Sequence, residues 1–298
     1  MILHKLEQQK LITPPSWLCD NTQFLCIVGS MSYGVSTDNS DMDYFGYAIP
    51  PKQDIFPNEI VDFDGRPAKE RFQHFITKAE THETKYDISI FNIVKYLKLC
   101  LECNPNLIDT LFTSQKCIVH ATQISDLIRD NRKIFLSKLI WPKFKNYAYR
   151  QLHKSESKNP KEGSKRKELR EQFGMDVKYL YNIVRLLSEC EQILIEGDLD
   201  LEEPSRREHM KEIRRGNISE KEIKEWASNK EKSLEELYLK SKLPDTPNPK
   251  KVKALLIDCL EIHYGSLQEN IQQPDWSLDA LKEYEMIANK YRNKLYQV

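Results

Sequence analysis

The sequence lacks three features that would assign the protein to a broad class directly. It carries no net charge, because 45 Lys and Arg balance 45 Asp and Glu among 298 residues, so nucleic-acid binding can be argued only from local patches. No apolar run is long enough to cross a membrane, and the first ten residues have no apolar signal-peptide core. With 40% hydrophobic and 30% charged residues, the sequence predicts a soluble globular protein with no membrane partner.

The sequence also has few cysteines at the spacings typical of disulfide frameworks or zinc sites. The seven cysteines are an odd number scattered through apolar segments, which argues against a disulfide framework and favours a reducing, cytoplasmic setting. Cys100 and Cys103 form a Cys-x-x-Cys, but the sequence has no second such pair and no His-x₃-His nearby. We therefore expect core thiols on a helix here, and zinc binding is the weaker alternative.

Two common phosphate-binding motifs, the Walker A sequence and the kinase glycine-rich loop, are absent. Their absence disfavours hydrolysis or transfer of a γ-phosphate. The chain has instead an apolar run of strand length, residues 24–28, that ends in Gly29-Ser30. Glycine lets the backbone approach a triphosphate, the Ser30 hydroxyl can donate to phosphate oxygens, and the following amides can complete an anion nest.

A pair of aspartates follows this run after a short polar segment. Asp41 and Asp43 stand two residues apart in a second predicted strand, 41–48, and Ser40 precedes them. Alternate residues of a strand share one face, so the two carboxylates would repel each other unless a divalent cation lay between them. Oxygen ligands suit Mg²⁺ or Mn²⁺. Such pairs are common in solvated turns, but this one follows a strand and Gly-Ser, an order that favours a catalytic phosphate and metal site.

A third carboxylate, Asp87, lies in a brief alternating segment, 86–90, that leads into an amphipathic helix. Asp is a common helix N-cap, but Ser89 lies nearer the helix and can take that role. Asp87 would then be free to face Asp41 and Asp43. Three carboxylates on neighbouring strands can hold two magnesium ions, one for the triphosphate and one that lowers the pKa of an attacking hydroxyl.

Helical patterns dominate the chain after residue 118. We predict helices over residues 122–139, 143–158, 164–196, 206–214, 219–240 and 249–270. Residues 52–86 contain a charged run with a helical pattern; the segment is either a flap over the substrate or a solvated excursion, and we favour the excursion. The sequence thus predicts an α+β chain, with a small mixed-sheet domain over residues 1–117 and a large all-helical domain over residues 118–298.

Together these motifs resemble the DNA polymerase β-like nucleotidyltransferase superfamily, in particular its predicted nucleotidyltransferases of bacteria and phages. The pattern Gly-Ser-x-x-Tyr-Gly and then Ser-Asp-x-Asp is matched by Gly29, Ser30, Tyr33, Gly34, Ser40, Asp41 and Asp43. The later matches are Asp87, Asn104-Pro105, the Tyr-Ala-x-x-Gln-Leu stretch at 147–152, Asp176, Lys178 and Arg185-Leu186-Leu187. The resemblance covers about residues 24–270. Where the group usually has a glutamate shortly after Asn-Pro, this chain has Asp109, and the role of that residue stays open.

The resemblance implies a metal-dependent nucleotidyltransferase that moves a nucleoside monophosphate from an NTP, such as ATP, to an acceptor and releases pyrophosphate. Asp41, Asp43 and Asp87 would be catalytic ligands of Mg²⁺ or Mn²⁺, and the helical domain would close the cleft. The nucleotide-binding residues would be Gly29, Ser30, Tyr33, Gly34, Ser40, Lys178, Tyr181 and Arg185, with Asn104 at the substrate. Lys178, Tyr181 and Arg185 share one helix face, although an exposed polar stripe would show the same spacing.

A basic stretch points to the acceptor. Residues 143–171 hold ten Lys or Arg against four Glu, with two tyrosines among them, and such a mixture suits a polynucleotide backbone and unstacked bases. We expect Arg150, Lys154 and Arg170 to contact RNA or another nucleic acid, although solvated helices often show similar stretches. A nucleic-acid end, with RNA ahead of DNA, is thus the favoured acceptor. The alternatives are a protein acceptor, as in toxin–antitoxin nucleotidyltransferases, and a non-catalytic RNA-binding member of the fold.

Overall fold

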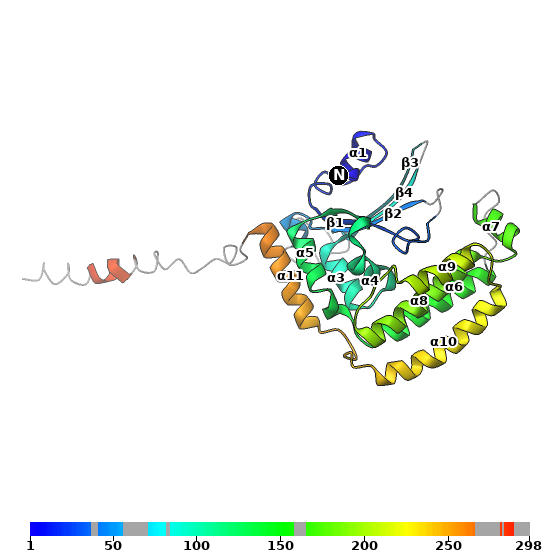
Figure 1. The fold of residues 1–298 in the computed structure, drawn as a ribbon. Helices are drawn as coiled ribbons and strands as arrows, with labels where there is room; N and C mark the ends of the chain where they lie inside the picture. Colours follow the sequence, from blue (N-terminus) through cyan, green and yellow to red (C-terminus); the bar gives the residue numbers. More distant parts are fainter. Residues whose placement is uncertain are drawn as a thin grey trace, which may run out of the picture. The chain divides into compact units, whose positions relative to one another are not determined.

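The structure is a computed structural model that describes residues 1–36, 41–55, 71–81, 84–157, 165–265, 281 and 283–288. The chain divides into two compact units, residues 1–257 and 258–298. The first unit contains the whole sheet and most of the helices (Figure 1). The predicted domain division at residue 117 stays a prediction.

Five strands form one mixed sheet in the order β3-β4-β2-β1-β5. They are β1 (Thr22–Val28), β2 (Met42–Ala48), β3 (His74–Glu80), β4 (Lys85–Asn92) and β5 (Ile118–Ala121). β1 runs antiparallel to β2 and β5, β3 runs antiparallel to β4, and β2 runs parallel to β4. The parallel register puts Asp43 of β2 beside Asp87 of β4. The α+β class with a mixed sheet is confirmed.

Helices precede, separate and follow the strands along the chain. They are α1 (Ile2–Gln8), α2 (Lys52–Ile55), α3 (Ile93–Leu101), α4 (Pro105–Phe112), α5 (Gln123–Asp130), α6 (Ile140–Ser157), α7 (Lys165–Phe173), α8 (Val177–Glu196), α9 (Pro204–Arg214), α10 (Glu220–Lys240) and α11 (Pro249–Tyr264), the last of which crosses from the first unit into the second. α8 packs against α6, α9 and α10, and Figure 1 shows these helices together. No helix in the described part of the chain is long and apolar enough to span a membrane.

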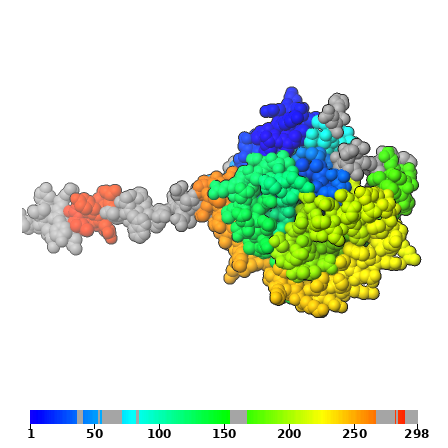
Figure 2. Space-filling model, viewed as in Figure 1, coloured from blue at the N-terminus to red at the C-terminus, as the bar shows by residue number. Residues whose placement is uncertain are grey.

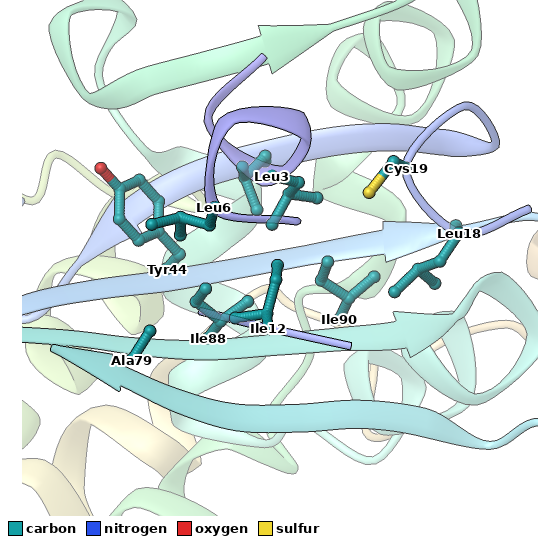
Figure 3. Close-up of a cluster of buried hydrophobic side chains, with 11 residues drawn as sticks. Leu3, Leu6, Ile12, Leu18, Cys19, Tyr44, Ala79, Ile88 and Ile90 are labelled. Atoms are coloured by element: carbon teal, nitrogen blue, oxygen red, sulfur yellow. The ribbon is translucent and has the colours of Figure 1, made fainter. Parts of the chain in front are cut away.

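Apolar side chains cover both faces of the sheet. On one face, Leu3 and Leu6 of α1 belong to a buried cluster with Ile88 and Ile90 of β4 (Figure 3). On the other face, the rings of Tyr47 in β2 and Tyr96 in α3 lie with their centroids 4.3 Å apart. Because side chains of a strand alternate between faces, Asp43 and Asp87 project from the same face as Tyr47. The two carboxylates therefore lie on the face that carries α3.

Two predicted helical regions contain strands. β3 lies in the charged run to which we gave a helical pattern, and β5 lies in the part that we took to be helical throughout. Both predictions were wrong. β5 is a short strand at the edge of the sheet, and its hydrogen-bond partner, β1, is distant in sequence. β3 pairs with β4 and alternates in exposure, so its charges lie on the solvent side.

Helix boundaries also differ from the prediction at three places. The predicted helix over residues 164–196 is broken at Gly174, which has φ +69°, and α8 restarts with Asp176 as its N-cap. The predicted helix over residues 122–139 ends at Asp130 and is followed by a 3₁₀ turn. Ser89 lies inside β4, and Asn92 caps α3 by accepting a hydrogen bond from the Val94 N–H at 2.8 Å. The side chains of Asp176 and Asn92 thus cap the starts of α8 and α3, which apolar periodicity did not locate. Cys100 and Cys103 are buried thiols.

Candidate active site

The turn after β1 holds the predicted phosphate-binding residues. Gly29 has φ +74°, and a Cβ placed on it would lie 2.9 Å from Oδ2 of Asp43. The Ser32 hydroxyl donates to the Gly29 carbonyl at 2.9 Å, and the Val35 N–H donates to the Ser30 carbonyl at 2.9 Å. The positive φ favours glycine at this position, and a side chain here would push the Asp43 carboxylate aside. This tight turn brings its backbone directly beside the Asp43 side chain.

The pKa of the Asp43 carboxyl is raised above its usual value. Burial is the main cause that raises the pKa of Asp43; Lys178 lowers it, and Asp87 and Asp41 raise it further. Asp41 lies just before β2 and is exposed, whereas Asp43 and Asp87 are partly buried and paired in register. The three predicted carboxylates are therefore close enough to influence one another, and Lys178 of α8 reaches the same region.

Lys78 is a neighbour of these carboxylates that the sequence did not reveal. It stands opposite Asp87 in the β3–β4 pairing, and its Nζ donates to Asp87 Oδ2 at 2.6 Å. Its strand was predicted to be helical, so no signal placed it beside Asp87.

The aspartates have the right donor atoms for a divalent cation, although their side chains are not grouped around one point in this structure. Within the described residues, no three His, Cys, Asp or Glu side chains are grouped closely enough to hold a metal ion. The donors around Asp43 are nevertheless carboxylate oxygens, which hard cations prefer. The repulsion that Asp41 and Asp87 exert on the charged form of Asp43 is also what a divalent cation would relieve. The donor set therefore fits Mg²⁺ or Mn²⁺.

A cavity of about 910 Å³ joins the sheet to the helices. The β1 turn and β2 line one part of it, and α4, α6, α7, α8 and α9 line the rest. Figure 2 shows that the early segments in blue and the green and yellow-green helices lie against one another. The predicted site residues that line the cavity are Gly29, Ser30, Tyr33, Asp41, Asp43, Lys178, Tyr181 and Arg185. Motifs from distant parts of the sequence thus meet around one cavity.

Other predicted site residues have different surroundings. Asn104 caps α4 by accepting from the Asn106 N–H at 3.1 Å, and it is Asn106 that lines the cavity. Gly34, Asp87, Arg150 and Arg170 are also outside the cavity lining. Ser40 and the Lys154 side chain lie outside the described residues. The substrate roles expected for this group stay predictions.

Arg185 sits in a buried ionic network rather than facing open solvent. Its guanidinium donates to Asp109 of α4 and to Glu189 Oε2 at 3.1 Å, and the three residues are 2%, 2% and 0% exposed. The Tyr33 hydroxyl donates to Asp109 Oδ2 at 2.7 Å, and the Arg185 guanidinium lies 4.7 Å from the centre of the Tyr33 ring. Burial raises the pKa of Glu189 to about 8, and Arg185 opposes that rise. Asp109, whose role the sequence left open, thus links the turn after β1 to α8.

A second group of basic residues lines the cavity from α9 and was missed by sequence reasoning. It comprises Lys211, Arg214 and Arg215. We had concentrated on residues 143–171, where Lys145 is engaged instead by Glu235 of α10 at 3.1 Å. The available signal was local charge, since residues 204–215 hold five Lys or Arg against two Glu.

Comparison with known proteins is consistent with a nucleotidyl-transfer site. The chain matches the family described as the RNA repair pathway DNA polymerase beta family over residues 3–258. A solved nucleotidyltransferase-like protein from Exiguobacterium sibiricum shares 10% identity at a TM-score of 0.28, over 80% of this chain and 73% of that one. At that score the likeness carries no argument about function. No curated protein matches the chain.

Proposed function

The chain belongs to the RNA repair pathway DNA polymerase beta family, and we propose on that basis that it transfers a nucleoside monophosphate from an NTP, such as ATP, to an acceptor and releases pyrophosphate. One observation carries the proposal: the Gly29 backbone lies directly against Asp43, which stands in register with Asp87. A phosphate on the turn would therefore lie next to paired carboxylates, as the proposed reaction requires.

Each part of the site has a distinct task in this proposal. Asp41, Asp43 and Asp87 would hold Mg²⁺ or Mn²⁺, which when bound neutralises triphosphate charge and lowers the pKa of an attacking hydroxyl. Lys178, whose charge acts on Asp43, would bind the phosphates nearest the carboxylates. The absence of a side chain on Gly29 lets the Asp43 carboxylate lie against the backbone of the turn, where the phosphates would bind. The ionic network around Arg185 would keep the turn in place through Tyr33.

RNA is the acceptor that we favour, because the family description names an RNA repair pathway. A cavity with basic residues on α8 and α9 suits a polyanion, which supports the same acceptor. A protein acceptor and a non-catalytic RNA-binding role are the alternatives. The presence of all three aspartates argues against the second alternative, because binding alone does not need them.

The test uses each NTP with a radioactive α-phosphate, Mg²⁺ or Mn²⁺, and separate pools of RNA, DNA and protein. We expect label in RNA, and none when the label is on the γ-phosphate, because pyrophosphate leaves. Asp43→Asn is the matched control, since it keeps the shape of the side chain and removes its charge. Label in polypeptide would refute the RNA acceptor, and label in no acceptor with the folded protein would refute nucleotidyl transfer.

A further inference from the structure

The basic residues at the end of α9 are not used by the nucleotide site described above. Arg215 pairs with Glu208 at 3.3 Å and also with Glu212, and Lys211 lies 3.8 Å from Glu208. Arg214 has no ion pair among the described residues, and its guanidinium lies 5.3 Å from the centre of the Tyr181 ring. Arg214 thus presents an uncompensated, oriented charge to the cavity.

These cations act less strongly on Asp43 than Lys178 does. Four charged residues have the largest effects on the pKa of Asp43 within the described part of the chain: Lys178, Asp87, Asp41 and Lys78. None of them belongs to α9. A triphosphate is compact and stays beside its metal-binding carboxylates, so Lys178 is the cation placed to hold it. The cations of α9, which line the same cavity, are therefore available for other phosphates.

An aromatic ring packs against Gly216, the glycine that follows these cations in the chain. Phe173, at the end of α7, fills the space that a Cβ on Gly216 would need, and Gly216 follows Arg214 and Arg215 directly. The ring lines the cavity and is partly exposed. Cations with an adjacent aromatic face are the usual elements of a single-stranded nucleic-acid site, where the cations take backbone phosphates and the ring takes a base.

We propose that Lys211, Arg214 and Phe173 bind the acceptor as a single-stranded RNA end, with its backbone phosphates on the two cations and one base on the ring. This assignment rests on the proposed function, because it supplies the second substrate of the same cavity. The cavity volume of about 910 Å³ is near the upper end of the roughly 300–1,000 Å³ usual for one small ligand. The cavity is therefore larger than most sites for one small ligand.

The test measures RNA binding and NTP binding separately. Fluorescence anisotropy of a labelled single-stranded RNA oligonucleotide is followed in rising KCl without NTP, for Arg214→Gln, Lys211→Gln and Phe173→Leu. Lys232→Gln is the control, because Lys232 is exposed on α10 and does not line the cavity. Calorimetry with an NTP and Mg²⁺ gives the nucleotide Kd of each variant. Circular dichroism confirms folding, and Lys211→Gln keeps the test valid if loss of the Arg214–Tyr181 contact unfolds the chain.

We expect each charge variant to raise the RNA Kd about fivefold and to reduce the salt slope by about 0.7, the value for one phosphate contact with a single strand. Phe173→Leu should raise the RNA Kd about tenfold with an unchanged slope, because stacking is uncharged. The nucleotide Kd and the Lys232→Gln control should match the wild type.

Two results would overturn the assignment. One is wild-type RNA affinity and salt slope in both charge variants; the other is an equal loss of NTP affinity, which would assign the cations to the triphosphate. If the wild-type protein labels RNA while the variants bind RNA normally, this inference fails and the proposed activity stands. If Arg214→Gln weakens RNA binding but the wild type labels no acceptor, the RNA site stands and the proposed activity fails.

Discussion

Replacing Arg185 with methionine would leave two carboxylates buried beside an apolar side chain. Arg185 bonds to Asp109 and Glu189, and all three residues are almost fully buried. Removing one partner of a buried ion pair costs about 3–5 kcal/mol, because the remaining charge stays out of water. A typical domain has only about 5–15 kcal/mol of stability. We therefore expect Arg185→Met to remove a large share of the free energy of unfolding.

The loss should depend on pH in a defined direction. Burial raises the pKa of Glu189 from 4.5 to about 8, so its protonated form stabilises the fold below pH 4.5 and that contribution is lost as pH rises toward 8. Burial raises the pKa of Asp109 as well. Arg185 lowers both values, and Arg206 of α9 acts in the same direction. Without Arg185 both carboxyls would hold their protons more tightly, so the penalty should grow as pH rises.

Urea unfolding followed by circular dichroism, at about pH 5.5 and about pH 8.5, measures both effects. Arg215→Met is the matched control, since Arg215 directly follows α9, is exposed, and forms ion pairs that face solvent. Exposed ion pairs contribute little, so its unfolding midpoint should hardly change. A loss below about 1 kcal/mol for Arg185→Met, or an equal loss at both pH values, would refute the assignment of a buried network.

Three further changes test the catalytic end of the cavity. Gly29→Ala should cost about 1–2 kcal/mol in unfolding free energy, because of its positive φ, and should also lower the transfer rate by displacing Asp43. Gly174 has a similar φ of +69°, but a Cβ there would meet no neighbour within 4 Å, so Gly174→Ala should lose stability and keep the transfer rate. Equal transfer rates in the two variants would contradict the predicted displacement of Asp43. Asp43→Asn should abolish transfer without lowering the unfolding midpoint, because ionising this carboxyl costs stability, and retained transfer would contradict its role. In a pH–rate profile, transfer should increase as pH rises through the raised pKa of Asp43, and a flat profile would show that its ionisation does not limit the reaction.

The part of the candidate site that is local in the chain could be predicted from the sequence. A strand, Gly29-Ser30 and an aspartate strand follow one another within about 25 residues, and adjacent strands joined in this way pair with each other. Because side chains alternate along a strand, the sequence could also predict that Asp41 and Asp43 share one face. Asp87 was also predictable, because an alternating segment before a helix suggests a strand of the same sheet.

Tertiary contacts, which the sequence does not show, control which charges are available to a ligand. Arg185 and Asp109 lie 76 residues apart and neutralise each other, Lys78 reaches Asp87 through a strand pairing, and Lys145 is engaged by α10. A local pattern shows the number of charges but not their burial or partners, which arise when distant segments pack. The same packing left Arg214 facing the cavity without an ion pair among the described residues, so the α9 cations gained their proposed role from the fold.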